Sequence, residues 1–328
     1  MDLPRWLAWA GPPADADGGG AASGWRANLV AFRRLVFVHT IVRNFLLLPE
    51  AEVLSETFGL STALRIAAIV AGACGLLAAS GAWPARAVCL ILLGEIYYAL
   101  PDSTNHVAVE LAPMVLFTFL DERKRDKEGD EGRLLLCAVR WFVAVFFLYT
   151  GVQKLLYGYY FQGQFLAFVA ATEERFAILF RWFIPDAEFE RLLSYNEINR
   201  ATGEPLLINR GTMPGKMRPV LGAGPYIVDS LLFKLLSNAV YLFEIVAGAL
   251  LLVPRVRTLA ALGAMAFVVL IEIGARELTF GLLMFNLLFV FLEGAWNKRL
   301  FWVLVGGYGA LVLHDLMDWQ NAFWYSPA

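Results

Sequence analysis

Lys154 is the residue of this chain whose surroundings best suit acid–base chemistry. It lies near the end of the apolar stretch 140–156, and an aromatic run over 157–161 follows it. An ammonium group close to hydrocarbon is costly, and removal from water favours the neutral form of a lysine. Because a neutral lysine can take a proton from a substrate, Lys154 is predicted to be a general base. The alternative is that Lys154 extends to the membrane surface, where tyrosines also gather.

A histidine at the start of another apolar stretch is the second catalytic candidate. His106 follows Asn105, and Glu110 comes four residues later, which places Glu110 and His106 on one face of a helix. An imidazole at such a place can position a substrate and donate a hydrogen bond to a carbanion-like intermediate. The alternative is a histidine that only bonds backbone groups at a helix start.

Carboxylates inside apolar stretches point to a polar pocket. Glu244 lies in the middle of 230–253, and Glu95 lies within 85–101. Intramembrane carboxylates are rare and usually face the bundle interior with partners. The alternative is that these carboxylates form ion pairs that only fix helix packing, and that the polar residues near 276 form a turn at the membrane surface. The residues predicted to bind substrate or cofactor are Asn105, Glu110, Gln153, Tyr149, Tyr157, Glu244, Glu272, Arg276 and Glu277.

Composition indicates a membrane protein. The chain has 328 residues, of which 59% are hydrophobic and 17% are charged, against about 45–50% and 25% in soluble domains. A net charge of -2 gives no basic field for nucleic acid. The three cysteines and three histidines are scattered, with none of the spacings that hold a metal, so no metal site is predicted.

The pattern of apolar stretches predicts an all-α, polytopic transmembrane helix bundle. A span needs about 20 apolar residues. The candidate spans, about nine by that length, are 30–48, 60–80, 85–101, 105–121, 133–156, 230–253, 257–275, 277–293 and 300–317. Residues 1–28 are predicted to be a flexible N-terminal tail and 29–328 the membrane domain. Between the fifth and sixth spans lies a long insertion, 157–229, amphipathic over 166–183 and predicted to be a loop over 184–225 because of its Pro, Gly and Asn content.

Basic residues set the predicted orientation. They gather in short connections at 26–34, 123–133 and 298–299, which the positive-inside rule places in the cytoplasm. The N-terminus is then cytoplasmic and the C-terminus extracytoplasmic. The long loop 157–229 is extracytoplasmic, and Lys154 and His106 lie at the same, outer membrane depth. We therefore expect a pocket that opens to the extracytoplasmic face.

Four stretches of the chain resemble vitamin K-dependent gamma-glutamyl carboxylases. They occur in the same order as in that family, and they are STNHVAVELAPMVLFTFLDE (103–122), FFLYTGVQKLLYGYYFQGQFL (146–166), KLLSNAVYLFEIVAGALLLV (234–253) and ELTFGLLMFNLLFVFLEG (277–294). The resemblance covers most of 30–294. The broader group is the bacterial HTTM membrane proteins, so the resemblance implies a bacterial inner membrane location.

The resemblance implies a catalytic lysine at Lys154, a substrate-side histidine at His106 and its neighbouring asparagine at Asn105. In the family, reduced vitamin K is deprotonated and reacts with oxygen. The strong base formed in this reaction removes a proton from a glutamate side chain, and carbon dioxide adds to the resulting carbanion. The quinol becomes an epoxide. The implied cofactor is reduced vitamin K or menaquinol, and no metal is implied. The expected partners are therefore the lipid bilayer and an isoprenoid quinone. Gln153 stands at the position where the family has a second lysine.

Several functions remain open from the sequence. The leading hypothesis is a carboxylase-like or quinol-epoxidase-like enzyme, of lyase or monooxygenase type, that modifies a peptide or a small molecule. The beta-rich extracytoplasmic domain of the family has no counterpart in the residues here. Two sources of substrate recognition stay open: the long loop 157–229 as a lid or platform, and a partner protein. The alternative is a non-enzymatic quinone- or lipid-binding membrane subunit. A transporter is disfavoured because no internal repeat is visible.

Overall fold

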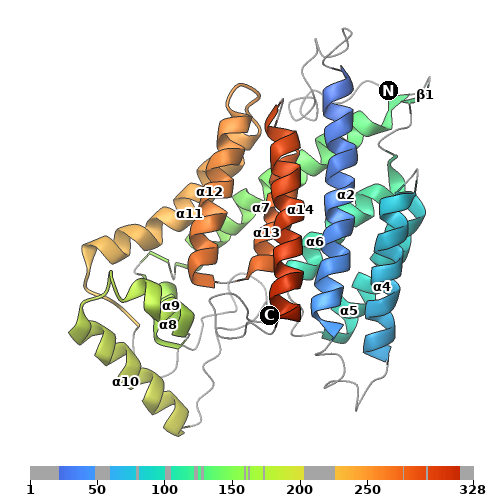
Figure 1. Cartoon of the computed structure of the whole chain (residues 1–328). Helices are drawn as coiled ribbons and strands as arrows, with labels where there is room; N and C mark the ends of the chain where they lie inside the picture. Colours follow the sequence, from blue (N-terminus) through green and yellow to red (C-terminus); the bar gives the residue numbers. More distant parts are fainter. Residues whose placement is uncertain are drawn as a thin grey trace. The chain divides into compact units, whose positions relative to one another are not determined.

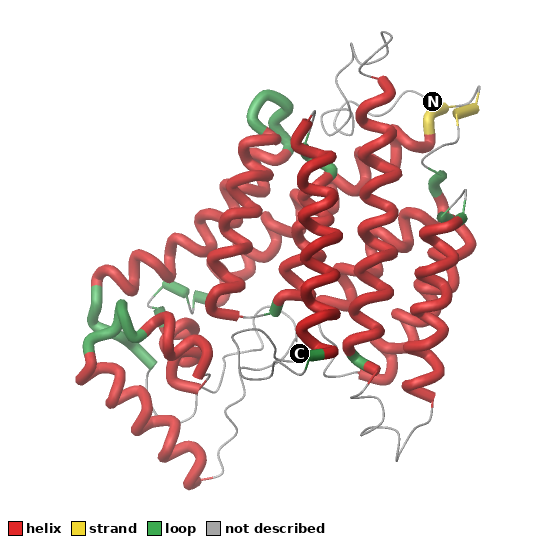
Figure 2. Tube along the Cα trace, viewed as in Figure 1, coloured by secondary structure: helices red, strands yellow, loops and turns green. Residues whose placement is uncertain are grey.

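The described part of the chain is almost entirely helical. The computed structural model describes residues 22–48, 60–78, 81–99, 105–121, 125–126, 129–158, 160–161, 163–172, 174–202, 226–275, 277–292 and 295–317. Two two-residue strands, β1 (Arg125–Asp126) and β2 (Gly129–Asp130), pair antiparallel, and the remaining regular elements are α-helices (Figure 1 and Figure 2). The all-α prediction is therefore confirmed for these residues.

The chain divides into two compact units. The first unit comprises 1–144, 250–268 and 277–328, and the second comprises 145–249 and 269–276. Helices wholly in the first unit are α2 (Ala22–Leu46), α4 (Leu60–Leu77), α5 (Ala82–Ala99), α6 (Asn105–Phe119), α13 (Leu278–Phe289) and α14 (Ala295–Leu316). Helices α7 (Glu131–Tyr157), α11 (Leu231–Leu251) and α12 (Arg257–Ala275) have residues in both units.

Small residues bring α2 and α4 into close contact in the first unit. A Cβ atom on Gly72 would lie 2.7 Å from Cγ1 of Ile41, and one on Gly75 would lie 2.5 Å from the ring of Phe37. Apolar helices in a membrane gain association energy from such close packing of glycine against a neighbouring side chain. This contact fixes α4 against α2 and, with it, the polar side chains that both helices carry.

The carboxyl end of the short helix α13 is stabilised by side chains from other elements. The carbonyl oxygen of Val290 accepts two hydrogen bonds from the guanidinium group of Arg140, at 3.0 and 2.8 Å. The carbonyl oxygen of Phe291 accepts a hydrogen bond from the hydroxyl of Thr258 at 3.2 Å, and that of Leu292 accepts one from the amide of Asn297 at 3.0 Å. The last carbonyls of a helix have no partner within it, so these bonds let α13 end at a buried position.

The second unit contains a compact helical core of its own. Helices α8 (Gln164–Thr172), α9 (Glu174–Phe180) and α10 (Asp186–Thr202) follow α7. Their buried side chains include Phe168, Phe180 and Leu192, which cluster with Tyr226 and Phe233 from the residues before and at the start of α11. The insertion between α7 and α11 is thus a folded helical structure over the part that is described.

Two predicted boundaries were wrong. Residues 186–202, predicted to be loop, form α10, with Asp186 and Glu188 in the first turn, where carboxylates favour a helix. The predicted tail 1–28 ends earlier, since α2 begins at Ala22. Residues 203–225 of the predicted loop lie outside the described residues.

Three helices in the described part of the chain are long and apolar enough to cross a membrane. They cover Glu131–Leu156, Leu231–Leu251 and Asn297–Leu316, and the apolar helices Thr62–Leu77, Val107–Phe119 and Leu278–Phe289 are shorter. These helices are in keeping with a membrane protein. The count of about nine spans and the orientation stay predictions.

Candidate functional site

Lys154 forms an ion pair with Glu244 in the second unit. Lys154 lies in the last turn of α7, and its Nζ donates to Oε1 of Glu244 on α11. The Lys154 side chain is 24% exposed and that of Glu244 is 7% exposed. A largely buried carboxylate is therefore neutralised by a lysine that other molecules can still reach.

A glycine allows the two helices to approach at this point. Gly151 precedes Lys154 by one turn of α7. A Cβ atom there would lie 2.7 Å from Cγ1 of Ile245 and 2.8 Å from the carbonyl oxygen of Tyr241 on α11. Because such distances are too short for a carbon atom, only glycine lets α7 and α11 lie close enough for the ion pair.

The turn after α7 places an aromatic ring beside the lysine. Gly158 and Gly163 have φ of 74°, which glycine adopts without strain. Between them Tyr160 lies with its ring centroid 5.5 Å from Nζ of Lys154, and it stacks on Phe165 at 5.0 Å. Burial, and after it the charge of Glu244, raises the pKa of the Tyr160 phenol. Tyr160 is therefore a neutral aromatic partner of the ammonium group at ordinary pH.

One oxygen of Glu244 has no hydrogen-bond donor among the described residues. Oε1 is bonded to Lys154, whereas the buried Oε2 accepts no bond from that part of the chain. The hydroxyl of Thr150 lies beside the Glu244 carboxylate and is close enough to count as a donor to it. Its single proton is directed at the carbonyl oxygen of Phe147, at 3.0 Å, which leaves Oε2 without a donor among these residues. A buried acceptor without a donor is unfavourable, so Oε2 is suited to accept a hydrogen bond from a bound molecule.

The other predicted residues of this site have different surroundings. Gln153 is half-buried and Tyr149 is exposed on α7, and Glu272 belongs to the same unit on α12. The Tyr157 side chain and Arg276 lie outside the described residues.

Further predicted residues belong to the first unit. Asn105 and His106 form the first turn of α6, and their side chains lie outside the described residues. Glu277 precedes α13 without a side-chain cap bond to it. The placement of His106 beside Lys154 stays a prediction.

The first unit contains a buried ionic network that joins four helices. Glu110 on α6 is fully buried. Its carboxylate accepts a hydrogen bond from the hydroxyl of Thr40 at 2.6 Å and one from the guanidinium group of Arg43 at 3.1 Å, both on α2. Arg43 also donates to Glu95 on α5 at 2.9 Å, and Glu95 accepts from Arg65 on α4 at 2.6 Å. Two guanidinium groups thus balance two carboxylates inside the unit.

A chain of polar side chains continues from Glu110 to α13 and α14. Nδ2 of Asn286 donates to the hydroxyl of Tyr308 at 2.7 Å, and this hydroxyl lies 3.0 Å from Nδ1 of His39. The other ring nitrogen of His39, Nε2, lies 3.9 Å from Oε2 of Glu110. The imidazole ring of His39 therefore lies between a phenol and a carboxylate.

The sequence predicted the carboxylates of this network but not their partners. Glu95 and Glu110 were predicted pocket carboxylates, whereas Arg43, Arg65 and His39 were not singled out. The signal was present, because both arginines lie inside predicted spans and His39 precedes Arg43 by four residues. Charged residues at such places usually pair with one another.

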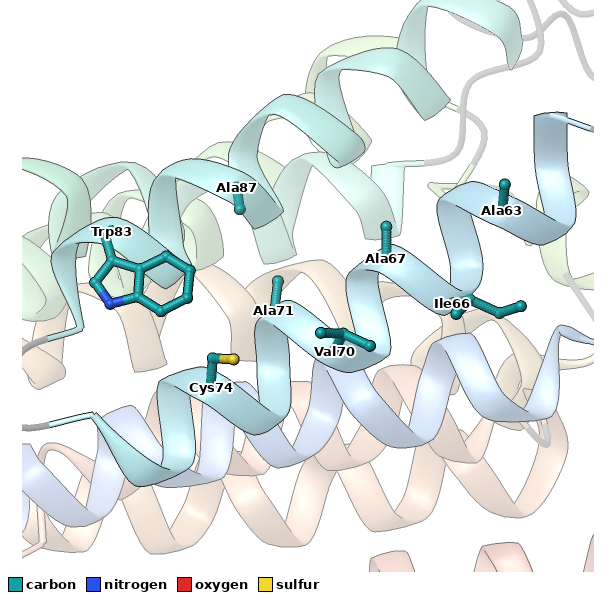
Figure 3. A pocket seen from close by; sticks show the side chains of 8 residues that line it. All are labelled: Ala63, Ile66, Ala67, Val70, Ala71, Cys74, Trp83 and Ala87. Atoms are coloured by element: carbon teal, nitrogen blue, oxygen red, sulfur yellow. The ribbon is translucent and has the colours of Figure 1, made fainter.

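An apolar groove of about 520 Å³ lies between α4 and α5. Its lining includes Ile66, Val70 and Cys74 of α4 and Trp83 of α5, and Figure 3 shows these side chains around it. It contains hardly any polar surface. The groove can therefore hold a hydrocarbon chain, and apart from the Cys74 thiol its lining is hydrocarbon and indole.

The fold and the two polar clusters define an α-helical protein with membrane-spanning candidates and charged pairs inside its helical units. In the described residues no group of three or more His, Cys, Asp or Glu side chains could hold a metal ion. Comparison with protein-family models gave no match, and comparisons with curated proteins and with solved structures gave no significant one.

Proposed function

We propose that the chain is a bacterial membrane enzyme that uses a reduced quinone, with oxygen, to modify a peptide or small-molecule substrate, as the vitamin K-dependent carboxylases do. The observation that carries the proposal is the Lys154–Glu244 pair, partly accessible at the end of an apolar helix. It lies within two of the four stretches that resemble the carboxylases. We further propose about nine spans, a cytoplasmic N-terminus and an active site at the extracytoplasmic face.

The residues around Lys154 suit a quinol. Oε2 of Glu244 can accept a hydrogen bond from a hydroxyl group, and the charge of Lys154 suits a partner that carries negative charge on oxygen. When bound, the quinol supplies the reducing equivalents for the reaction with oxygen. The burial of Glu244 strengthens the electrostatic interactions of its carboxylate.

Turnover of reduced menaquinone or vitamin K tests the proposal. Purified protein in nanodiscs, with oxygen present, is expected to form the epoxide, and Lys154→Ala is expected to abolish it. Lys234→Ala is the matched control, because Lys234 is on α11, the helix of Glu244, but pairs with Asp229 at the surface, at 3.2 Å. Full turnover by a folded Lys154→Ala variant, or none by the wild type under any condition, would contradict the proposal.

The second candidate is a quinone- or lipid-binding subunit without catalysis. The apolar groove between α4 and α5 favours it, because the groove accepts a hydrocarbon chain and its lining is almost wholly apolar. In that case Lys154→Ala would lower the yield of folded protein or its assembly with a partner. The wild type would bind menaquinone without consuming it.

A further inference from the structure

We propose that Glu244, and not Lys154, accepts the hydroxyl proton of the bound aromatic alcohol, while Lys154 remains an ammonium ion that stabilises the resulting anion. This inference rests on the proposed function, since the aromatic alcohol is the reduced quinone. It assigns a catalytic role to a carboxylate that the sequence suggested only as a binding residue.

The bonding of Lys154 leaves it unsuited to act as the base. Its Nζ donates to Oε1 of Glu244 and faces the ring of Tyr160 at 5.5 Å. A carboxylate oxygen and an aromatic face are the partners that an ammonium group binds. An ammonium ion has three donors and no lone pair, so it cannot take up a proton.

The second oxygen of Glu244 provides the lone pair that Lys154 lacks. Oε2 is buried, accepts no hydrogen bond from any described residue, and belongs to a side chain that is only 7% exposed. An ionised carboxylate is an acceptor only. A hydroxyl group is thus the simplest chemical partner for Oε2.

The proton transfer conserves both atoms and charge. The O–H bond of the aromatic alcohol breaks, its electron pair stays on the aromatic oxygen, and the proton forms a new O–H bond with Oε2. Before the transfer, Lys154 and Glu244 carry opposite charges. Afterwards Glu244 is neutral and the aromatic oxygen is the partner of Lys154. The site has no net charge in either state, so the transfer avoids the cost of an unpaired charge in an apolar environment.

The end of α7 that carries Lys154 exposes apolar side chains. Lys154 is a quarter exposed, and Leu155 and Leu156, which follow it in the chain, are exposed by 40% and 73%. An apolar ring therefore gains contacts at this end of the helix. A charged or strongly polar substrate would gain nothing from this surface.

Ligand binding without turnover tests the role of Glu244. The probes are 2-methyl-1-naphthol and its methyl ether, in which a methyl group replaces the hydroxyl proton. Binding is followed by tryptophan fluorescence in nanodiscs. The wild type is expected to prefer the naphthol by about 10- to 100-fold, the range for a hydrogen bond to a charged group. Glu244→Gln is expected to lose most of that preference, whereas Glu190→Gln, an exposed glutamate of α10, should keep it.

Lys154→Arg separates the two candidate bases. Arginine keeps the positive charge but cannot be deprotonated. If Glu244 is the base, Lys154→Arg loses less quinol turnover than Glu244→Gln, which loses about 10²-fold or more. A folded Lys154→Arg variant that binds quinol but loses as much turnover as Glu244→Gln, or an unchanged preference in Glu244→Gln, overturns the inference.

The turnover experiment tests the proposed function, and the naphthol-binding experiment tests the role of Glu244, so their negative results are distinguishable. Absence of quinol turnover by the wild type would remove the proposed function, and the naphthol preference would still decide whether Glu244 accepts a hydroxyl proton. Absence of the preference in the wild type would overturn the assignment of Glu244 even if quinol turnover were observed. Should Glu244→Gln fail to fold, turnover by Lys154→Arg decides which of the two residues is the base.

Discussion

Arg43 is bonded to two carboxylates at once. Its guanidinium group donates to Glu110 at 3.1 Å and to Glu95 at 2.9 Å, and the Arg43 side chain is only 14% exposed. A guanidinium group presents several donors in one plane, which lets it join α5 and α6 to α2. Lysine, with a single compact charge, would not replace it.

We expect Arg43→Met to destabilise the protein by about 3–5 kcal/mol, because removal of one partner leaves buried carboxylates uncompensated. Thermal unfolding in detergent would measure the change. Arg181→Met is the control: Arg181 is 61% exposed and lies 3.9 Å from Asp186, and an exposed pair contributes about 0–1 kcal/mol. Equal effects of the two substitutions would show that the network contributes no more than a surface pair.

Helix α7 depends on a glycine for its position against α11. The atoms closest to a Cβ at Gly151 include backbone atoms of Tyr241 and Ile245, which cannot move aside as a flexible side chain can. The separation of the two helices at Gly151 therefore also sets the distance between Lys154 and Glu244.

Gly151→Ala is expected to lower stability by about 1–3 kcal/mol through overpacking, and to lower quinol turnover because the two helices move apart. Unfolding curves and turnover rates together would measure both effects. Gly306→Ala is the matched control, since a Cβ at Gly306 of α14 meets nothing within 4 Å, and alanine favours a helix by up to about 1 kcal/mol. A Gly151→Ala variant as stable and active as the Gly306→Ala variant would refute the tight contact.

The elements were more predictable than their contacts. The apolar stretch 133–156 was predicted almost as α7 is observed, because apolar length and periodicity are local properties. Helix α10 was missed, since the Pro, Gly and Asn content of the whole segment 184–225 hid the helix-favouring residues at its start.

Pairings between distant residues could not be derived from one sequence. Glu244 was recognised as unusual, yet its bond to Lys154 joins residues 90 positions apart. The chain from Asn286 through Tyr308 to His39 depends on three helices meeting at one place. Composition and spacing carry no information on which helices meet, so the ionisable residues could be predicted without their partners.

At the scale of the whole molecule, the two polar clusters differ in how fully their charged groups are hydrogen-bonded. In the first unit, Arg43 and Arg65 are matched by Glu95 and Glu110. In the second unit, Glu244 keeps one buried oxygen without a donor among the described residues. The first cluster is therefore suited to hold helices together, and the second is suited to bind and react.

The ionic network has a consequence for how the protein is made. Ribosomes release α2 and α4, with Arg43 and Arg65, before α5 and α6, with Glu95 and Glu110. Arg43 lies in the last turn of α2 and Arg65 in the second turn of α4, and an arginine within an inserting helix costs up to about 2.5–3.5 kcal/mol on insertion scales. A nascent chain stopped after residue 78 is therefore expected to insert poorly, and one extended past residue 121 to insert well, as glycosylation mapping would measure. On the proposed assignment of spans, we expect α2 and α4 to insert together with α5 and α6, whose glutamates pair with the two arginines.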